Sequence, residues 1–458
     1  MTGVWMTSAT ASSEERVPPA EAAAERRAPS PARPKIGLVC EITNGNLGNA
    51  AFEAATVQHI LRYYPEAQLY VSSLDSVAAF SALKVELFPL NPDAERLGQK
   101  EARSPERGSG GSFLDTVEQV PVLGGVIRHA AHAAYRAWRI AENLVFWFRA
   151  ARILRGFRLL ILCGGGQLSD WWGGPWAHPY TLFMWSCLCR LLGTKLVVLN
   201  VAVEHVSSPL SRWFLTRVLR AASYRSFRDE NSRRAVEEWG VPGPNHVYPD
   251  LAFSLAIPPR ITTTTHSDRP IIGVSPMPYC DPRVWPVKDA AAYRKYLSIL
   301  AQFSRALIDR GFAVMLLATQ IRMDVRALRD LRDLIIDNDP TRAKWIIEPE
   351  IANVADFLGE MPKLELLVAS RMHGLLLAQL VACPALAISY DDKCDALMAG
   401  LGLTEFCLDI QTVDEESLTA RFDALRTARD KVTAQLQQRV AAYRDMLQNQ
   451  YDQVFGTG

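Results

Sequence analysis

Two continuous apolar runs restrict the folds open to this chain more than any other feature of its sequence. They are RLLILC at residues 158–163 and KLVVLNVAV at residues 195–203. A strand with one face in water alternates apolar and polar residues, whereas an unbroken run is typical of a strand that helices cover on both faces. Because segments with helical spacing alternate with these runs, we expect a parallel, doubly wound sheet of the α/β class.

The same pattern extends over most of the chain. The first region has expected strands at 36–40, 68–73, 84–88 and 224–227, with a glycine loop and a helix after the first of them. The second region has expected strands at 271–275, 313–319, 344–348, 364–369 and 385–390, and helices that begin at Lys288, Asp324, Ile351 and His373. We therefore predict two Rossmann-like domains, at 35–260 and 265–412, joined by a proline- and threonine-rich linker. A helical stripe at 413–458 forms a tail that can fold back across the hinge.

Three segments depart from this pattern. Residues 1–34 are rich in Ala, Pro, Ser and Arg, which predicts a disordered leader and not a secretory signal. Residues 94–112 are charged and Gly/Ser-rich, as in a mobile loop. Residues 116–154 form a basic, aromatic-rich helical insertion, which either packs across its own sheet or makes a peripheral contact with an anionic membrane.

Charge and cysteine content exclude several classes of protein. The 458 residues carry 50 Lys+Arg against 49 Asp+Glu, a net charge of +1, which rules out a diffuse polyanion binder and gives no support to nucleic-acid binding. Eight cysteines occur without a C-x-x-C pair, so we expect neither a zinc knuckle nor a disulfide framework, and we expect no metal site. The longest stretch without Asp, Glu, Lys or Arg, 171–189, contains Pro179 and is better interpreted as a loop followed by a buried helix than as a membrane span. A cytoplasmic protein, with a peripheral position at the inner face of the membrane left open, is the simplest expectation.

Three loops follow predicted strands, where parallel sheets bind ligands. They are Asn44–Asn49, Gly164–Gln167 and Ser370–Gly374. The third combines Arg371, which is always charged, with His373, which can exchange a proton near neutral pH. The alternative is a structural one, in which the histidine caps a helix and the arginine pairs with a neighbouring acid.

Taken together, these loops resemble the polysaccharide pyruvyl transferase family. The matching segments, in the family's order, are GNLGNAA (45–51), LLILCGGGQLSD (159–170), SFRDENSRRAVEEWGV (226–241), YPDLAF (248–253), SRMHGLLLAQLVACPALAISYDDK (370–393) and LMAGLGL (397–403). The resemblance implies a GT-B-like fold, with two Rossmann-like domains facing across a cleft. It also implies transfer of a pyruvyl group from phosphoenolpyruvate to two sugar hydroxyls, as in exopolysaccharide or cell-envelope biosynthesis, with phosphoenolpyruvate as co-substrate and no tightly bound cofactor.

The chemistry of phosphoenolpyruvate assigns expected roles to residues that lie mostly in the second domain. His373 is the expected general acid that protonates the enol carbon, and Arg371 grips the carboxylate or phosphate in a bidentate manner. Ser370 and Gly374 flank them at the start of the helix. Lys393 and Arg228 are further phosphate candidates, although a surface ion pair explains either equally well.

The expected acceptor side lies in the first domain. Sugar hydroxyls are expected to meet Asn46, Gly48, Asn49, Gly165, Gly166, Gln167 and Asp170. Trp171 and Trp172 are either faces for sugar stacking or core residues. The acceptor is a polysaccharide or a lipid-linked precursor.

The sequence departs from the family at two places in this half. An acidic residue is usual in the first glycine loop, where this chain has Asn49-Ala50-Ala51, and a glycine-rich turn is usual where it has 202–208. In that turn, Glu204 and His205 either act as a base or cap a helix. Two other functions stay open: a nucleotide-sugar glycosyltransferase, for which no E-x6-E-like ribose signature is present, and a non-catalytic member that binds a glycan or a membrane assembly.

Overall fold

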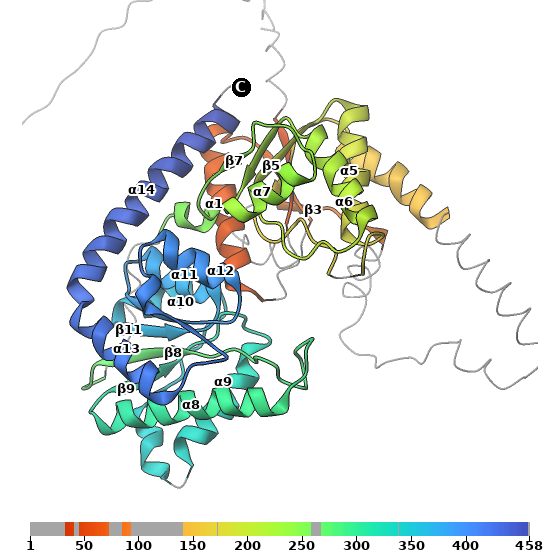
Figure 1. Cartoon of the computed structure of the whole chain (residues 1–458). Coiled ribbons are helices and arrows are strands. Elements are labelled where there is room, and N and C mark those ends of the chain that lie inside the picture. The colour runs from red at the N-terminus through yellow and green to blue at the C-terminus, as the bar shows by residue number, and fades with distance from the viewer. Residues whose placement is uncertain are drawn as a thin grey trace, which may run out of the picture. The chain divides into compact units, whose positions relative to one another are not determined.

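The computed structural model describes residues 33–40, 45–72, 85–92, 141–171, 173–257, 267–337 and 339–456. The predicted leader up to residue 32, the loop 94–112, residues 116–140 of the insertion and Trp172 lie outside the described residues. Residues Pro34–Gly458 form one compact unit with two sheets and covering helices (Figure 1). The predicted α/β class is confirmed, whereas the boundaries at 260, 265 and 412 stay a prediction.

The first sheet has seven strands in the order β3-β2-β1-β4-β5-β6-β7. Every neighbouring pair is parallel. The strands are β1 (Lys35–Val39), β2 (Gln68–Val71), β3 (Val85–Leu87), β4 (Phe157–Cys163), β5 (Lys195–Val201), β6 (Tyr224–Phe227) and β7 (His246–Val247). Its helices are α1 (Leu47–Tyr63), an unlabelled helix at 141–154, α5 (His178–Leu192), α6 (Pro209–Ala221), α7 (Glu230–Glu238) and the 3-10 turn η2 (Leu251–Ser254).

The second sheet has six strands in the order β10-β9-β8-β11-β12-β13, again all parallel. The strands are β8 (Ile271–Ser275), β9 (Ala313–Leu316), β10 (Ile346–Ile347), β11 (Leu364–Ala369), β12 (Ala385–Ser389) and β13 (Cys407–Asp409). The helices are α8 (Ala290–Asp309), α9 (Asp324–Ile336), α10 (Val354–Glu360), α11 (Met372–Leu380), α12 (Asp392–Gly400), α13 (Glu415–Thr427) and α14 (Arg429–Phe455), with 3-10 turns at Pro340–Trp345, Met361–Lys363 and Thr404–Phe406.

Burial on both faces accounts for the unbroken apolar runs. In β4, Leu159 and Ile161 join a core that continues into the second sheet, whereas Leu160 and Leu162 join a separate core under α5 and α6. The apolar residues of β4 are therefore buried on both faces of the sheet, as the apolar runs predicted.

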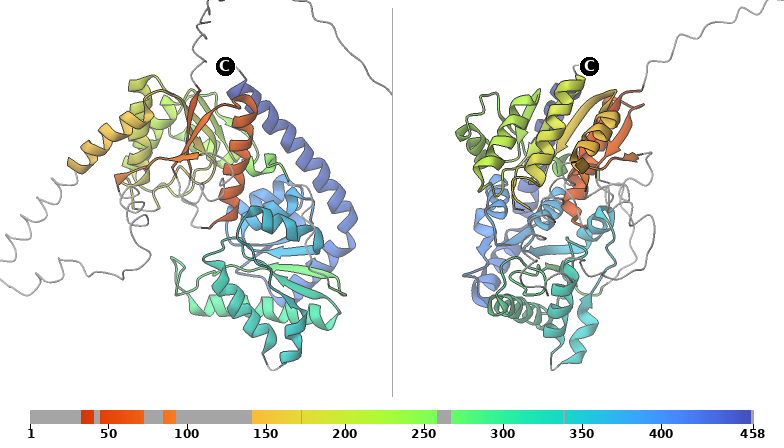
Figure 2. Two further views of the ribbon diagram at one scale, coloured as in Figure 1. Left: turned by 180° about the vertical axis from the view of Figure 1, so that it is seen from behind. Right: turned by 90° about the vertical axis from the view of Figure 1, so that its right-hand side faces the viewer.

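The C-terminal helix α14 contacts elements of both sheets (Figure 2). The side-chain amide of Gln450 donates to Oδ1 of Asn200 at 2.6 Å and to Oγ of Ser226 at 2.7 Å, both on the first sheet. Near the middle of α14, the hydroxyl of Tyr443 donates to the carbonyl of Gly400 at 2.8 Å, at the end of α12. The predicted tail therefore folds back, as two helices that meet at Ala428.

Candidate active site

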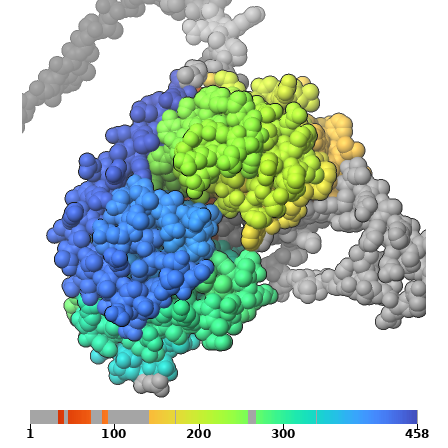
Figure 3. All heavy atoms as spheres, viewed as in Figure 1, coloured from red at the N-terminus to blue at the C-terminus, as the bar shows by residue number. Residues whose placement is uncertain are grey.

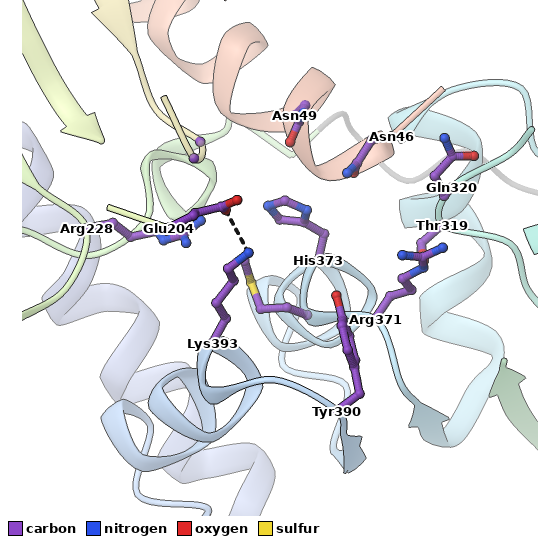
Figure 4. Close-up of a pocket in the computed structure, with 13 residues that line it drawn as sticks. Asn46, Asn49, Glu204, Arg228, Thr319, Gln320, Arg371, His373, Tyr390 and Lys393 are labelled. Carbon is purple, nitrogen blue, oxygen red and sulfur yellow. Dashed lines mark ion pairs between the residues drawn. The ribbon is translucent and has the colours of Figure 1, made fainter. Parts of the chain in front are cut away.

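A cavity of about 160 Å³ lies where loops from the two sheets meet (Figure 4). It is lined by polar and charged side chains from both halves of the sequence. The lining residues are Asn46, Asn49, Gly165, Gly166, Glu204, Arg228, Thr319, Gln320, Arg371, Met372, His373, Tyr390 and Lys393.

Main-chain hydrogen bonds fasten the two halves together beside this pocket. The amide of Leu47 donates to the carbonyl of Thr319 at 3.0 Å, and the amide of Ile321 donates to the carbonyl of Gly45 at 2.9 Å. Asn46 and Gln320 thereby form an isolated antiparallel bridge. The side chain of Asn46 accepts from the amide of Gly48 as the N-cap of α1, so this strip, which we call the clasp (residues 45–47 and 319–321), fixes the first turn of α1 at the pocket.

His373 stands in the first turn of α11, directly against α1. A Cβ built on Gly48 would overlap its imidazole, so only glycine permits this approach of the two helices. The ring of Phe52 lies 6.5 Å away, centroid to centroid. Burial lowers the pKa of His373 to about 4, and its Nε2 is buried without a hydrogen-bond partner. The imidazole is therefore neutral at pH 7 in the ligand-free protein, with one buried ring nitrogen unsatisfied.

Arg371 precedes α11 and is held by a fully buried carboxylate. Its Nε and Nη2 donate to Oδ1 of Asp324 at 3.1 and 2.7 Å. The other oxygen of Asp324 accepts from the amide of Gln320 at 2.8 Å, which ties the arginine to the clasp. Burial alone would lower the pKa of Arg371, but Asp324 outweighs it and holds that pKa above its ordinary value. The structural alternative of an acid-paired arginine is thus present, yet Asp324 takes only two of five N–H donors, and Arg371 still lines the pocket.

Lys393 approaches the pocket from α12 and pairs across it with the first sheet. Its Nζ lies 2.6 Å from Oε1 of Glu204 and 3.7 Å from Oδ2 of Asp391. Burial by itself would lower the pKa of Lys393, but these carboxylates raise it above the ordinary value. Glu204 has room there because a Cβ on Gly166 would overlap its carboxylate.

Arg228 follows β6 and completes the cationic wall. Its Nη1 lies 3.6 Å from Oδ2 of Asp250, and its side chain is mostly buried. It also lines a neighbouring cavity of about 110 Å³, which shares Lys393 and Met372 with the first pocket.

Eight of the predicted site residues line this pocket: Asn46, Asn49, Gly165, Gly166, Arg228, Arg371, His373 and Lys393. Their predicted roles stay predictions. Gly48 and Gly374 lie next to the pocket as packing positions, the latter against Thr319.

Three predicted residues point elsewhere. The amide of Gln167 is buried between the carbonyl of Val39 and Nε2 of His178. Asp170 accepts from the amides of Ser207 and Ser208, directly before α6, and these bonds outweigh burial to lower its pKa. The hydroxyl of Ser370 lies 2.6 Å from that of Tyr296.

Trp171 is half exposed, and its ring lies 5.0 Å from that of His205, outside the pocket lining.

Sequence reasoning missed Asp324, Thr319, Gln320 and Tyr390. Tyr390 belongs to the quoted SYDDK segment, so its place after a strand was a usable signal. Asp324 follows no glycine loop, and nothing local marks it as the partner of Arg371. No group of His, Cys, Asp and Glu in the described part of the chain is arranged to hold a metal ion. Nor is any described helix long and apolar enough to cross a bilayer.

A family model described as polysaccharide pyruvyl transferase matches residues 46–392. Two solved structures of similar fold are UDP-GlcNAc 2-epimerases. The enzyme from Methanocaldococcus jannaschii aligns with a TM-score of 0.51 at 9% identity, over 85% of this chain and 91% of that chain. The enzyme from Neisseria meningitidis, bound to UDP-GlcNAc, aligns with a TM-score of 0.51 at 10% identity, over 88% of this chain and 94% of that chain. At this identity the likeness shows the fold alone, and it confirms the GT-B-like arrangement.

Proposed function

The chain belongs to the polysaccharide pyruvyl transferase family, and from that premise we propose that it transfers a pyruvyl group from phosphoenolpyruvate to two hydroxyls of a sugar acceptor. The acceptor belongs to a polysaccharide or its precursor, the product is a ketal, and phosphate is released.

The observation that carries this proposal is the convergence of Arg228, Arg371 and Lys393 with His373 on one small pocket. Three cations suit a small trianion, and arginine forks match carboxylate and phosphate oxygens. The cavity of about 160 Å³ is smaller than the roughly 300–1,000 Å³ that drug-sized ligands occupy, which favours a compact donor over a sugar nucleotide.

The reaction needs one proton delivered and two removed. A proton adds to C3 of phosphoenolpyruvate, which makes C2 electrophilic, and the first sugar hydroxyl forms a C–O bond to C2 as it loses its proton. The second hydroxyl then bonds to C2 while the C2–O bond to phosphate breaks. Of the two hydroxyl protons, one balances the proton gained by C3 and the other leaves on phosphate.

His373 is the residue we assign to the proton at C3. In the free protein its pKa is lowered to about 4, so at neutral pH the imidazole lacks the second ring proton that it would donate as an acid. A bound trianion favours the imidazolium through its charge, so donor binding would charge His373 where it is needed. Because of this coupling, His373 would deliver a proton only when phosphoenolpyruvate is bound.

Glu204 is the residue we assign to the hydroxyl proton. In the ligand-free structure it neutralises Lys393 (Figure 4). When the anionic oxygens of phosphoenolpyruvate pair with the ammonium group of Lys393, the carboxylate of Glu204 loses its partner. It then stands free on the side of the pocket formed by the first sheet. Asn46, Asn49 and the main chain of Gly165 and Gly166 line the pocket there and can receive the acceptor hydroxyls.

The test is to incubate the purified full chain with phosphoenolpyruvate and a panel of free and lipid-linked sugars. We expect phosphate release together with an acceptor whose mass has increased by one pyruvate ketal. Arg371→Ala should abolish the thermal shift with phosphoenolpyruvate, whereas Arg421→Ala, an exposed arginine on α13, should keep it. A protein that binds no phosphoenolpyruvate at all would contradict the proposal.

A further inference from the structure

The outer side of α5 and α6 carries a continuous group of aromatic rings. Trp213 on α6 lies 5.4 Å from Phe183 on α5, and Trp176, just before α5, lies 5.6 Å from both Tyr180 and Phe214. Tyr180 in turn accepts a hydrogen bond from Nε1 of Trp147 at 3.2 Å, which attaches the helix 141–154 to the group. Rings from three helices thus adjoin one another on one side of the first sheet.

Much of this apolar material is exposed. Trp176 is 67% exposed, Trp213 is 46% exposed, and Leu191 at the end of α5 is 77% exposed. Leu210 on α6 is exposed as well, four residues before the buried Phe214. Trp176 and Trp213 are connected through the ring of Phe214, and Leu210 lies one helical turn before Trp213. We call Trp176, Leu210 and Trp213 the aromatic face; contiguous apolar exposure of this kind marks an interaction surface.

The charges that α5 and α6 place beside the aromatic face have one sign. The sequences of α5 and α6 contain no Asp or Glu, and they contribute Arg190, Arg212, Arg217 and Arg220. The guanidinium of Arg217 lies 5.3 Å from the centre of the Trp213 ring. Arg190, Arg212 and Arg217 are exposed, and none of them forms an ion pair with another described residue.

We propose that the aromatic face docks on the surface of an anionic lipid bilayer. Tryptophan rings prefer the boundary between headgroups and acyl chains, and arginines beside them attract acidic headgroups. A second copy of this chain is a poorer occupant, because a two-fold contact would bring the same arginines against one another. Charge complementarity therefore favours the lipid surface.

The aromatic face lies on helices that begin beside the candidate active site. α5 follows the loop of Gly165 and Gly166, and α6 follows Glu204, so both helices begin at the sheet edge that lines the pocket. In Figure 3 the yellow-green atoms of this part of the chain reach the molecular surface. Docking here would hold that edge close to the bilayer. The proposal does not depend on what the pocket binds.

Flotation of the purified full chain with vesicles tests the proposal. We expect the protein to float with vesicles that contain phosphatidylglycerol, to float poorly with phosphatidylcholine alone, and to be released by high salt. Trp176→Ser/Trp213→Ser and Arg212→Glu/Arg217→Glu should each reduce binding about ten-fold or more. Arg294→Glu/Arg421→Glu makes the same charge change at exposed positions on α8 and α13 and should bind like the wild type.

Circular dichroism checks that each variant is folded, and the wild-type comparison of the two lipids is decisive even if a variant is not. Absence of flotation with phosphatidylglycerol overturns the proposal, as does flotation that both double variants retain. A molar mass by light scattering that falls from dimer to monomer in the tryptophan variant, without lipid binding by the wild type, would identify a second copy as the occupant instead.

Discussion

Nζ of Lys393 lies 2.6 Å from Oε1 of Glu204, so one ion pair joins the two sheets across the wall of the candidate active site. Both side chains are about one-third exposed, at 31% and 30%. Pairs with such access to water contribute about 0–1 kcal/mol. We therefore expect phosphoenolpyruvate to separate Lys393 from Glu204 at little cost in free energy, by competing with the carboxylate for the ammonium group.

Glu204→Gln separates binding from turnover. We expect phosphoenolpyruvate to bind a few-fold more tightly, because the lysine no longer has a competing carboxylate, while turnover falls about 100-fold or more through loss of the base. Calorimetric titration and phosphate release measure the two effects. Glu237→Gln on α7 is the control, and a variant with unchanged turnover would remove Glu204 from the mechanism.

Asp324→Asn should weaken the binding of phosphoenolpyruvate, although Asp324 itself is not expected to contact that substrate. The amide preserves the shape of Asp324 but not the charge that holds Arg371, and loss of one partner of a buried pair costs about 3–5 kcal/mol of stability. We expect a higher KM for phosphoenolpyruvate and a lower midpoint in urea. Asp333→Asn, an exposed carboxylate on the same helix, should change neither.

Gly48→Ala should separate α1 from α11, because the new methyl group overlaps the imidazole of His373. Overpacking of this kind costs about 1–3 kcal/mol. Gly359→Ala on α10 is the matched control, since nothing lies within 4 Å of a Cβ there. Equal melting temperatures for the two variants would show that the helices do not meet as described.

Donor binding should take up a proton near neutral pH. The pKa of His373 is about 4 in the free protein, and an adjacent trianion raises it, so the bound state holds more protons at pH 6–7. Calorimetry in buffers of different ionisation enthalpy measures this uptake. His373→Asn should abolish it, and uptake that persists in this variant would assign the proton to another group.

Acid should destabilise the fold through two buried histidines. Burial lowers the pKa values of His178 and His373 to about 4, below the ordinary value of about 6.5. The unfolded chain therefore binds more protons between these values, and stability falls as the pH drops from about 6.5 to about 4, by ~3 kcal/mol for each histidine. Urea midpoints measured across this range check the slope, which His178→Gln should make shallower.

The sequence predicted the longer strands of both sheets and the loops that line the pocket, because both follow from local patterns. The expected strands at 224–227 and 271–275 match β6 and β8 residue for residue. Two edge strands, β7 and β13, were missed because two or three residues are too few to show a period.

The sequence did not predict the direction of individual side chains or their partners far along the chain, because neither depends on a local pattern. Gln167 and Asp170 lie in a loop that borders the pocket, yet their polar groups satisfy buried main-chain and side-chain atoms instead. Asp324 is 47 residues from Arg371 in sequence, and only the packing of α9 against the clasp reveals that they pair. The exposure of Trp176 and Trp213 became visible only once α5 and α6 were placed on the sheet.

The clasp is built from main-chain atoms, and this has a consequence for how such a sequence can diverge. A substitution at Leu47, Thr319 or Ile321 that fits the packing around it leaves the amides and carbonyls that fasten the loops in place. Only proline at the two donor positions removes those bonds outright. We therefore expect substitutions in the clasp of homologous chains to spare its two main-chain hydrogen bonds, so that the pocket keeps its frame, whereas Gly45, with a φ of 84°, and Asn46, which caps α1, should vary least.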